Sequence, residues 1–480
     1  MKIAKTFNIS LFFIVAFVAF SCKANMTIKW WSSTKDKKWE EQRNLLWQEI
    51  DSSSRVIDAI VYPDSLQQVI DGFGGCFNEL GWDALRYLVP KKQERVLSEL
   101  FSSGGSLKFT FGRLPIGASD YALSYYSLND SANDYSMENF SIDRDKQMLI
   151  PYIKAALEQN SDIHFWASPW TPPAWMKKNK HYACASGSVN NLSTKLQGKE
   201  GEDQIIDNDT ILNAYAKYFV KYVKEYKKED IGIEAIHVQN EFNSCQVFPS
   251  CVWSDTTLSL FIGKYLGPHF ESSKLKTEIW LGTIERPSIQ IIDTILLKNN
   301  VLKYIKGLGF QWGGKGAIAA AHNKYPKLKL MQTETECGAG KNDWDDMEHT
   351  FQLMKHYFNS GANSYMSWNM VLDESGKSTW GWKQNSLITI NKRTRKTYYN
   401  PEFYLFKHFS GNIPPGSRKV KISGNLDDLL AFVTPHDDLI IILANTQNKK
   451  RDVCLKVNDK LIELKMSAHS VNSLQCFNIK

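Results

Sequence analysis

The sequence predicts a (β/α)8 barrel with a side β-sandwich domain, and three observations lead to this fold class. The chain has 480 residues, which is enough for one large barrel with an appendage. Its middle part alternates eight short apolar runs of β-type composition with stretches of helical periodicity, the pattern of a parallel βα fold. Further strand-like runs lie before and after this part.

The eight strand-like runs define the barrel, which we expect over residues 66–410. They occupy residues 68–77, 107–117, 163–170, 233–241, 277–285, 305–313, 328–336 and 363–370. The clearest helix between them spans 209–230, where large apolar residues recur at spacings of three and four, namely Leu212, Tyr215, Phe219, Tyr222 and Tyr226. A helix over 401–409 would follow the eighth strand and complete the last unit.

The two flanks of the barrel are both strand-like. Residues 27–65 contain Thr27-Ile-Lys-Trp-Trp-Ser and Val56-Ile-Asp-Ala-Ile-Val-Tyr, and the chain after Pro414-Pro415 alternates apolar runs with turns. Two strands alone would be marginally stable. We therefore expect residues 27–65 and 411–480 to pair into one β-sandwich.

The first residues have the composition of an export signal. Lys2 and Lys5 precede an apolar run over 9–20, which is too short to span a membrane but suits a signal peptide. The run ends at Ser21-Cys22, which resembles a bacterial lipobox. This predicts a signal peptide over 1–21, lipid attachment at Cys22, and a bacterial lipoprotein in the periplasm or outer membrane. Plain secretion without lipid is the alternative.

Seven other cysteines are scattered along the chain, and none forms a CxxC pair. The spacing therefore predicts no zinc or iron–sulfur site and no metal. Cys245 and Cys251 flank a short loop that could close as a disulfide, whereas buried thiols are the expectation for most of the others.

The charge balance disfavours nucleic acid as a partner. Lys and Arg number 58 against 51 Asp and Glu, a net charge of +7, and no run of basic residues is dense enough to follow a phosphate backbone. We expect contact with a membrane only through the N-terminal lipid anchor. The 15 tryptophans suit a protein that stacks aromatic rings on sugars.

Two glutamates stand at the predicted ends of barrel strands, where the active sites of such barrels lie. Glu241 ends the fourth run and Glu334 ends the seventh, so both carboxyls can point into one cleft. Glycoside hydrolysis needs such a pair, one to protonate the departing oxygen and one to attack or stabilise the sugar. A single glutamate at a strand end is often structural, and Glu285 and Glu336 are the nearby alternatives.

Six short motifs occur in order at these strands. They are Asp71-Gly-Phe-Gly-Gly, Arg113-Leu-Pro-Ile-Gly-Ala-Ser-Asp, Ala167-Ser-Pro-Trp-Thr-Pro-Pro-Ala-Trp, Asn240-Glu241, Thr333-Glu334 and Ser367-Trp368-Asn369. With these motifs the chain resembles glycoside hydrolase family 30, the glucosylceramidase family, over nearly all its mature length. That family combines a barrel with a β-sandwich, as expected here.

The resemblance implies roles for single residues. Glu241 matches the acid/base and Glu334 the nucleophile, while Asn240 matches the residue that binds the sugar 2-hydroxyl. Asp120 and Trp170 match residues that hold outer hydroxyls, Trp368 matches the wall beneath the ring, and Arg113 matches a buried arginine that supports the nucleophile. A purely structural ion pair is the alternative role for Arg113. Gln311 and Trp312 stand where animal glucosylceramidases carry a histidine after strand six, so the leaving-group side differs from theirs.

The predicted function is a retaining β-glycosidase that hydrolyses β-linked glucosides by double displacement without a cofactor. A glucosylceramidase-like enzyme is the main expectation, an endo-β-1,6-glucanase is the alternative, and β-xylosidase or β-fucosidase activity comes behind these. The substrate partner would be a β-glucoside, as a glycan or a glycolipid. A non-catalytic carbohydrate-binding lipoprotein on the same barrel would have lost one of the two glutamates, and both are present.

Overall fold

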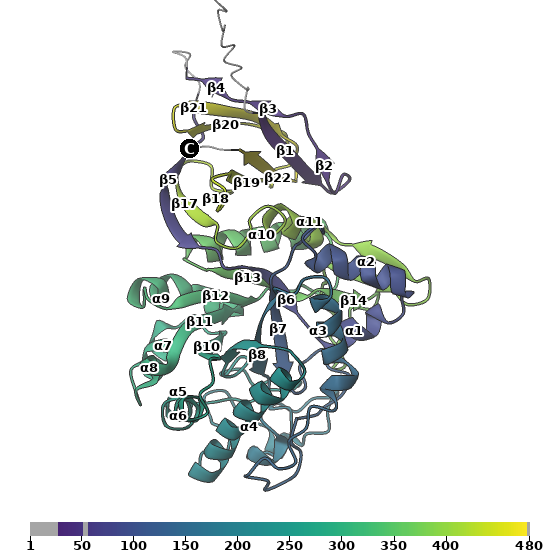
Figure 1. Ribbon diagram of the computed structural model, residues 1–480, viewed down its shortest axis with the longest axis vertical. Helices are drawn as coiled ribbons and strands as arrows, with labels where there is room; N and C mark the ends of the chain where they lie inside the picture. Colours follow the sequence, from purple (N-terminus) through teal and green to yellow (C-terminus); the bar gives the residue numbers. More distant parts are fainter. Residues whose placement is uncertain (1–26, 51–55, 478–480) are drawn as a thin grey trace, which may run out of the picture.

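A closed barrel of eight parallel strands forms the centre of the protein (Figure 1). The computed structural model describes residues 27–50 and 56–477, so the predicted signal peptide and Cys22 lie outside the described residues. The barrel strands are β6 (Gly72–Cys76), β7 (Phe111–Ile116), β8 (His164–Pro169), β9 (Ile233–His237), β10 (Glu278–Ile284), β11 (Ile305–Gln311), β12 (Lys329–Glu334) and β13 (Ser364–Asn369). They stand in sequence order, and β13 pairs with β6 to close the barrel. The predicted fold class is therefore confirmed.

Helices follow most of the strands and cover the outside of the barrel. The α-helices are α1 (Glu79–Leu85), α2 (Pro90–Phe101), α3 (Leu149–Leu157), α4 (Asp209–Lys228), α5 (Asp255–Leu260), α6 (Gly267–Ser272), α7 (Ile289–Leu296), α8 (Val301–Tyr304), α9 (Ile318–Lys324), α10 (Trp344–Asn359) and α11 (Pro401–Phe409). Five shorter or wider helical turns join them, namely η1 (Asp145–Gln147), η2 (Ala174–Met176), η3 (Thr194–Leu196), η4 (Phe261–Leu266) and η5 (Trp312–Gly316).

Helix α4 shows how local sequence sets an element. The side chain of Asn208 accepts a hydrogen bond from the backbone N–H of Ile211 and so caps the first turn. Asp209 in the first turn and Lys227 and Lys228 in the last turn match the helix dipole. All five apolar residues of the predicted stripe are buried against the barrel.

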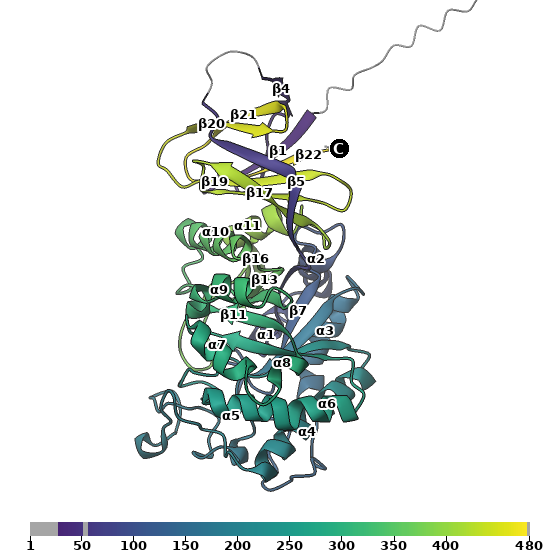
Figure 2. The ribbon, with the colours of Figure 1, turned by 90° about the vertical axis from the view of Figure 1, so that its left-hand side faces the viewer.

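The two flanks form one β-sandwich above the barrel (Figures 1 and 2). Strand β1 pairs with the last strand, β22, and β5 lies between β17 and β20, so strands from both ends of the chain alternate in the sheet. The strands are β1 (Thr27–Thr34), β2 (Glu40–Glu41), β3 (Leu45–Leu46), β4 (Gln48–Glu49), β5 (Ala59–Val69), β17 (Arg418–Gly424), β18 (Leu429–Val433), β19 (Leu439–Asn445), β20 (Arg451–Val457), β21 (Lys460–Met466) and β22 (Ser470–Cys476). Strand β5 continues past residue 65 and leads through a short connection into β6.

Strand β19 holds the sandwich and the barrel together, because both of its faces are buried. Ile441 and Leu443 point into the sandwich core, whereas Ile440 and Ile442 belong to the core shared with the barrel. Successive residues of a strand face opposite sides, so this continuous apolar run serves two cores at once. Burying both faces makes the sandwich part of the same packed body as the barrel.

A small sheet after the eighth barrel strand has no counterpart in the sequence expectations. It consists of β14 (Val371–Asp373), β15 (Ile388–Asn391) and β16 (Lys396–Tyr399). The strands have three or four residues each, too few for a clear alternating pattern. They anchor the long loop 374–387, which forms one wall of the cleft described below.

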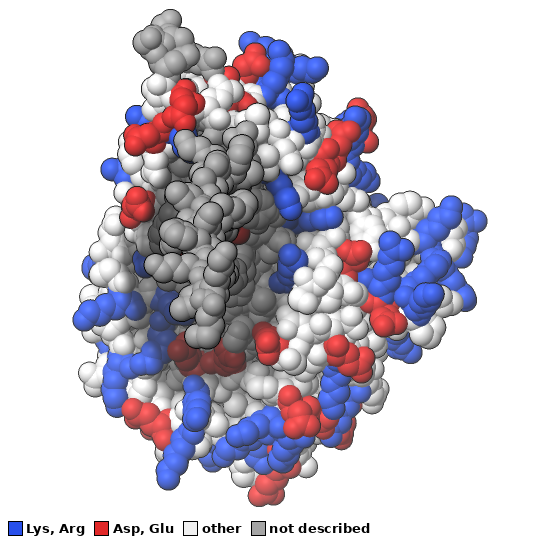
Figure 3. All heavy atoms as spheres, turned by 45° about the horizontal axis from the view of Figure 1, so that its top comes forward, with Lys and Arg blue, Asp and Glu red and all other residues white. Residues whose placement is uncertain are grey.

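The outer surface carries basic and acidic side chains interspersed with one another on the face seen in Figure 3. Many pair locally, as Lys228 does with Glu225 and Lys303 with Glu271. Exposed pairs of this kind contribute at most about 1 kcal/mol each, so the fold depends mainly on its buried cores. Among the described residues no helix is long and apolar enough to cross a membrane.

His408 of α11 links the barrel to the sandwich through two buried hydrogen bonds. Its Nε2 and Nδ1 lie 2.9 Å from the hydroxyls of Ser33 and Ser473, respectively. Ser33 already donates its proton to the carbonyl of Lys38, so it accepts from Nε2–H, and Nδ1 accepts from Ser473. Burial, with the charge of Lys407, lowers the pKa of His408 to about 3, so the ring is neutral.

We expect His408→Gln to destabilise the protein at pH 7 by about 1–3 kcal/mol, because two buried hydroxyls lose their partner. The folded-state pKa lies below that of a free histidine, so in the native protein His408 lowers stability as the pH falls below about 6.5, by up to about 1.4 kcal/mol per pH unit. The variant should lack this part of the acid sensitivity. Denaturant unfolding between pH 4 and 7 measures both effects, with exposed His436→Gln as control. Equal pH slopes in wild type and variant would contradict the assignment.

Candidate active site

The predicted site residues of the barrel lie together at the carboxyl ends of its strands. Nine side chains gather there, namely Arg113, Asp120, Trp170, Asn240, Glu241, Gln311, Trp312, Glu334 and Trp368. The tenth predicted residue, Cys22, lies outside the described part of the chain. The strand ends therefore bring residues far apart in sequence into one site, as barrels of this kind do.

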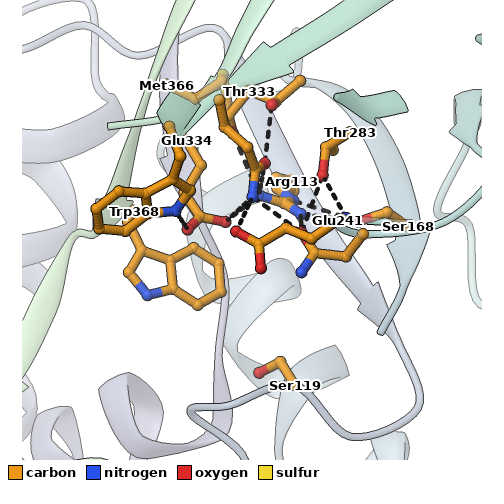
Figure 4. Close-up of polar contacts among 12 residues, drawn as sticks. Arg113, Ser119, Ser168, Glu241, Thr283, Thr333, Glu334, Met366 and Trp368 are labelled. Atoms are coloured by element: carbon orange, nitrogen blue, oxygen red, sulfur yellow. Dashed lines mark hydrogen bonds and ion pairs between the residues drawn. The ribbon is translucent and has the colours of Figure 1, made fainter. Parts of the chain in front are cut away.

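Arg113 on β7 is the centre of the site (Figure 4). Its guanidinium is fully buried and donates to Glu334 Oε2 at 2.6 Å, to Asn240 Oδ1 at 2.6 Å and to Ser168 Oγ at 3.1 Å. Three indole rings surround the same group. The ring centres of Trp166, Trp170 and Trp368 lie 5.0, 4.5 and 5.5 Å, respectively, from the guanidinium carbon. Each hydrogen bond fixes a neighbouring side chain in a single orientation.

Glu334 is the last residue of β12, as the sequence predicts. One carboxyl oxygen accepts from Arg113, and the other accepts from Trp312 Nε1 at 3.2 Å. Burial raises the pKa of Glu334, but the Arg113 charge and the hydrogen bonds oppose that rise. The carboxylate is thus held by donors on both oxygens.

Glu241 does not end a strand, which corrects the expected boundary of the fourth run. Strand β9 stops at His237, and Glu241 follows in the loop with a positive φ of 48°. The left-handed backbone is unusual for glutamate. Its N–H donates to the carbonyl of Thr283 at 3.2 Å and to the hydroxyl at 3.1 Å, and this neighbour on β10 holds the turn in place. The sequence still predicted Glu241 as a site residue, because the loop that carries it begins directly after β9.

Gln311 connects the two glutamates. Its Nε2 lies 3.2 Å from an oxygen of Glu241 and 3.3 Å from an oxygen of Glu334. Since one nitrogen reaches both, these two oxygens are at most about 6.5 Å apart. In Figure 4 both carboxyl groups point into the same space.

The two carboxyls lie in different electrostatic surroundings. Burial raises the pKa of Glu241 well above its ordinary value, and the negative charges of Glu334 and Glu285 raise it further. Among the described residues no cation contacts Glu241, whereas Arg113 is bound to Glu334. Glu334 is therefore the carboxyl that loses its proton first, and Glu241 is the one that keeps it.

The side-chain oxygen of Asn240 accepts three hydrogen bonds. That oxygen accepts from Arg113 at 2.6 Å, Thr283 Oγ1 at 3.0 Å and Gln311 Nε2 at 3.2 Å. This fixes the amide orientation and leaves the NH₂ group on the side of the cleft, which Asn240 lines. The NH₂ group can therefore donate to a bound hydroxyl.

Asp120 lies in the loop after β7 with one carboxyl oxygen that is buried and has no hydrogen-bond partner among the described residues. Burial and the charge of Glu334 raise the pKa of Asp120 well above its ordinary value. Beside it, Trp170 packs on Trp368 with ring centres 5.4 Å apart, and Trp368 Nε1 donates to Gln384 at 2.8 Å. A buried oxygen without a partner next to aromatic walls suits a sugar hydroxyl as its missing donor.

A cleft of about 550 Å³, large enough for a small-molecule site, is lined by six of these nine residues, namely Asp120, Trp170, Asn240, Glu241, Trp312 and Glu334. Its walls also contain loop residues that were not predicted from the sequence, namely Ser244, Gln246, Phe248, Arg286, Pro287, Gly313, Gly338, Trp382, Lys383 and Gln384. Apart from Gly313, which ends the expected run 305–313, none of them lies in a periodic run, so periodicity gave no signal for them. Ser168, which supports Arg113, stands inside the third motif and was open to detection.

The two alternative carboxyls take other roles. Glu336 is bound by Lys315 at 2.5 Å and His349 at 2.9 Å, which lower the pKa of Glu336 and occupy both oxygens. Glu285 lines the cleft, and burial raises its pKa to about 7. It accepts from Asn243 N–H at 2.9 Å and therefore braces the loop that carries Glu241.

A larger hollow of about 720 Å³ opens at the opposite end of the barrel. It contains charged side chains of both signs around Trp166 and Trp280, and it is remote from the paired glutamates. Over the described ranges no three His, Cys, Asp or Glu side chains are grouped so as to hold a metal ion.

Comparison with known proteins identifies the family. The TIM-barrel domain of glycosyl hydrolase family 30 matches residues 70–413, and the beta sandwich domain of the same family matches residues 416–474. A relative named putative glucosylceramidase 1, from Caenorhabditis elegans, is 30% identical over 79% of this chain and 74% of its own. Lysosomal acid glucosylceramidase from Mus musculus is 26% identical over 83% of this chain and 78% of its own.

Solved structures show the same fold. SrfJ from Salmonella typhimurium superimposes with a TM-score of 0.84 at 24% identity, covering 94% of this chain and 100% of its own. An endo-beta1,6-glucanase superimposes with a TM-score of 0.78 at 22% identity, covering 94% and 99%. The two domain matches and the 30% identical relative show that the chain belongs to glycosyl hydrolase family 30 and is a glucosylceramidase-like glycoside hydrolase.

Proposed function

We propose that the protein hydrolyses β-linked glucosides with retention of configuration, using Glu334 as nucleophile and Glu241 as acid and base. The observation that carries this proposal is the pair of carboxyls bridged by Gln311, with facing oxygens at most about 6.5 Å apart. Retaining glycosidases hold their carboxyls about 5–5.5 Å apart, whereas inverting enzymes need about 6.5–9.5 Å to fit a water between them.

The reaction follows from this arrangement in two displacements. An oxygen of Glu334 attacks the anomeric carbon as the bond to the leaving oxygen breaks, and Glu241 gives its proton to that oxygen. The product is an ester between Glu334 and the sugar. Glu241, now a carboxylate, removes a proton from water, which attacks the same carbon and frees Glu334. Two inversions restore the β configuration.

The electrostatic difference between the carboxyls supports this division of roles. Arg113 stabilises the charged form of Glu334, which a nucleophile requires. Glu241 has a raised pKa from burial and two neighbouring carboxyls, so it can hold a proton at neutral pH. Glycosidases commonly use such a pair of carboxyls with opposite protonation states.

The sugar before the scissile bond would lie between the aromatic walls and the polar groups beneath them. Asp120 offers a buried acceptor, Asn240 offers an amide donor, and Trp170 with Trp368 forms the apolar wall. The amide of Asn240 lies next to both carboxyls through Arg113 and Gln311. That is the place where a hydroxyl adjacent to the anomeric carbon would be bound.

We infer that the leaving group is a sugar, so that the natural substrate is a β-linked glucan such as a β-1,6-glucan. The cleft that Glu241 lines is also lined by Gln246, Glu285, Arg286 and Lys383. These groups can form hydrogen bonds to the hydroxyls of a second sugar. A lipid chain in the same place would remove water from them and offer no hydrogen bonds in return. Glucosylceramide is the second candidate, supported by the 30% identity to a relative named as a glucosylceramidase.

The location proposed for the protein is an exported, lipid-anchored state through Cys22. The support is the apolar run that ends at Ser21-Cys22. Cys22→Ser should move the protein from the membrane fraction to the soluble fraction, because one sulfur carries the attachment. An unchanged membrane fraction would refute the lipoprotein assignment.

The reaction and its substrate can be tested in one experiment. Proton NMR of hydrolysis of the β-1,6-glucan pustulan, glucosylceramide and aryl β-glucoside and β-xyloside should show the β anomer as the first product. Pustulan should be hydrolysed with the highest kcat/KM of the natural substrates. An α anomer appearing first would refute retention, and a preference for glucosylceramide would refute only the sugar leaving group.

Replacing each glutamate should separate the two roles. Glu334→Ala removes the nucleophile, so every substrate should lose activity. Glu241→Ala should lose ~10²–10⁴-fold with an alkoxide leaving group, but little in the first step with a dinitrophenyl glycoside, which leaves without a proton. Azide should then restore turnover and give a β-glycosyl azide. A β-azide from Glu334→Ala together with an α-azide from Glu241→Ala would exchange the assignments, because azide gives the inverted product only where it replaces the nucleophile.

Glu285→Gln should move the basic limb of the kcat/KM profile to lower pH. Glu241 must be protonated for the first step, and the negative charge of Glu285 raises the pKa of Glu241. Removing that charge lowers the pKa, so the acid form is lost at lower pH. Glu336→Gln is the matched control, because Lys315 and His349 already neutralise that carboxyl. A shift in the control equal to that in Glu285→Gln would contradict the effect.

A further inference from the structure

Three cysteines lie around one buried lysine on the loops beside the cleft. Lys177 is fully buried, and its ammonium donates to the carbonyls of Tyr182, Ala183 and Ser250 at 2.9, 3.2 and 2.7 Å. Its charge acts on the sulfurs of Cys184, Cys245 and Cys251. Cys184 belongs to the loop 170–208 after β8, whereas Cys245 and Cys251 belong to the loop 238–254 after β9.

The backbones of the two loops are hydrogen-bonded at this point. The N–H groups of Cys184 and Ala185 donate to the carbonyl of Gln246 at 3.0 and 2.8 Å, and Ala183 forms an antiparallel bridge with Pro249. The side chains of Cys184 and Cys245 are in hydrogen-bonding contact. The two thiols thus meet between loops whose backbones are already paired, so a disulfide between them would join the two loops covalently.

The space around Cys184 is built for its sulfur. A Cβ on Gly198 would lie 2.5 Å from Cys184 Sγ, so only glycine leaves room for the sulfur there. The N–H of Gly198 donates to the carbonyl of Cys184 at 2.7 Å and holds the segment in place. A substituted residue 198 would push the sulfur away from its partner.

The two thiols differ in acidity. The hydrogen bond from Cys245, with the charge of Lys177, lowers the pKa of Cys184 to about 7 against the effect of burial. The same hydrogen bond and burial raise the pKa of Cys245. One of the two protons is therefore lost near neutral pH, and the other is shared across the contact.

We propose that Cys184 and Cys245 form a reversible disulfide that clamps the loop of the acid/base residue to the loop of the preceding barrel strand. The short spacing of Cys245 and Cys251 in the sequence had suggested a different pair. Cys251 is instead fully buried, its sulfur lies against the carbonyl of Val252 at 3.8 Å, and burial raises its pKa to about 12. It is an unreactive thiol beside the reactive pair.

The bond forms by exchange with a disulfide from solution, such as oxidised glutathione. Cys245 is partly exposed and attacks first: the Cys184 thiolate accepts its proton as the Cys245 sulfur bonds to one sulfur of the donor, and one glutathione thiolate is expelled. Cys184 then loses its proton and attacks the Cys245 sulfur, which expels the second. Two protein thiols lose two protons and two electrons, and the donor disulfide is reduced to two thiols.

The clamp would act on the leaving-group side of the cleft. Cys245 shares its loop with Glu241 on one side and with Gln246 and Phe248, which line the cleft, on the other. The loop of Cys184 begins at Trp170, which forms the sugar wall. Formation of the bond does not depend on the proposed reaction, so its failure would leave the proposed function untouched.

Peptide mapping of the protein after reduction and then treatment with oxidised glutathione tests the pairing. We expect a cross-linked peptide pair containing Cys184 and Cys245 that has lost the mass of two hydrogen atoms. The oxidised form should unfold at a temperature roughly 2–4 °C above the reduced form, because the bond closes a long loop. A protein mass that does not fall by two hydrogen atoms on oxidation, or a bond between Cys245 and Cys251, would overturn the proposal.

Three variants complete the test. Cys184→Ser and Cys245→Ser should each abolish both the cross-link and the difference between the oxidised and reduced unfolding temperatures. Cys251→Ser, from the same cluster, should keep both. If one of the Cys184→Ser and Cys245→Ser variants does not fold, the other still tests the pairing. A cross-link that forms equally in Cys184→Ser, or an unfolding temperature in the wild type that does not respond to oxidation, would refute the clamp.

Discussion

The buried charge of Arg113 is the constraint on which the rest of the site depends. A guanidinium taken out of water is costly unless its donors are all used, and an unpaired buried charge destabilises a protein by several kcal/mol. Here Glu334, Asn240 and Ser168 supply the acceptors, from three different barrel strands or their loops, and three indole rings cover its faces. Satisfying one charge therefore fixes the Glu334 carboxyl, the Asn240 amide beside it and the aromatic wall in a single arrangement.

The same charge sets the two glutamates apart. The Arg113 charge lowers the pKa of Glu334, whereas Glu241 is near three other carboxyls, Glu334, Glu285 and Asp120, and one neutral amide donor, Gln311. Two chemically identical side chains a few ångströms apart thus come to prefer opposite protonation states. Gln311 is suited to bridge them, because a neutral donor can contact both carboxyls without favouring the ionised form of either as strongly as a cation would.

Sequence patterns predicted the elements that are set by periodicity and burial. All eight barrel strands fall within the expected runs, and α11 has the expected bounds, because alternation and helical spacing are local signals. Glu241 was found although β9 ends before it, since the chain leaves the barrel at that point. The small sheet β14–β16, the brace from Glu285 and the contact of Cys184 with Cys245 were not predicted. They depend on which loops meet in space, and neither periodicity nor spacing carries that information.

This division between barrel and loops also bears on the substrate. The groups that would hold the first sugar, Trp170, Asn240 and Trp368, stand on barrel strands or within three residues of a strand end, where the barrel limits their movement. The leaving-group side is built from the loops after β9 and β10 and from the loop 374–387. Loops tolerate sequence change better than barrel strands do. A shared first-sugar site with variable loops would let one fold accept glucosides with different leaving groups, and a covalent tie between two of these loops would hold one version of that wall in shape.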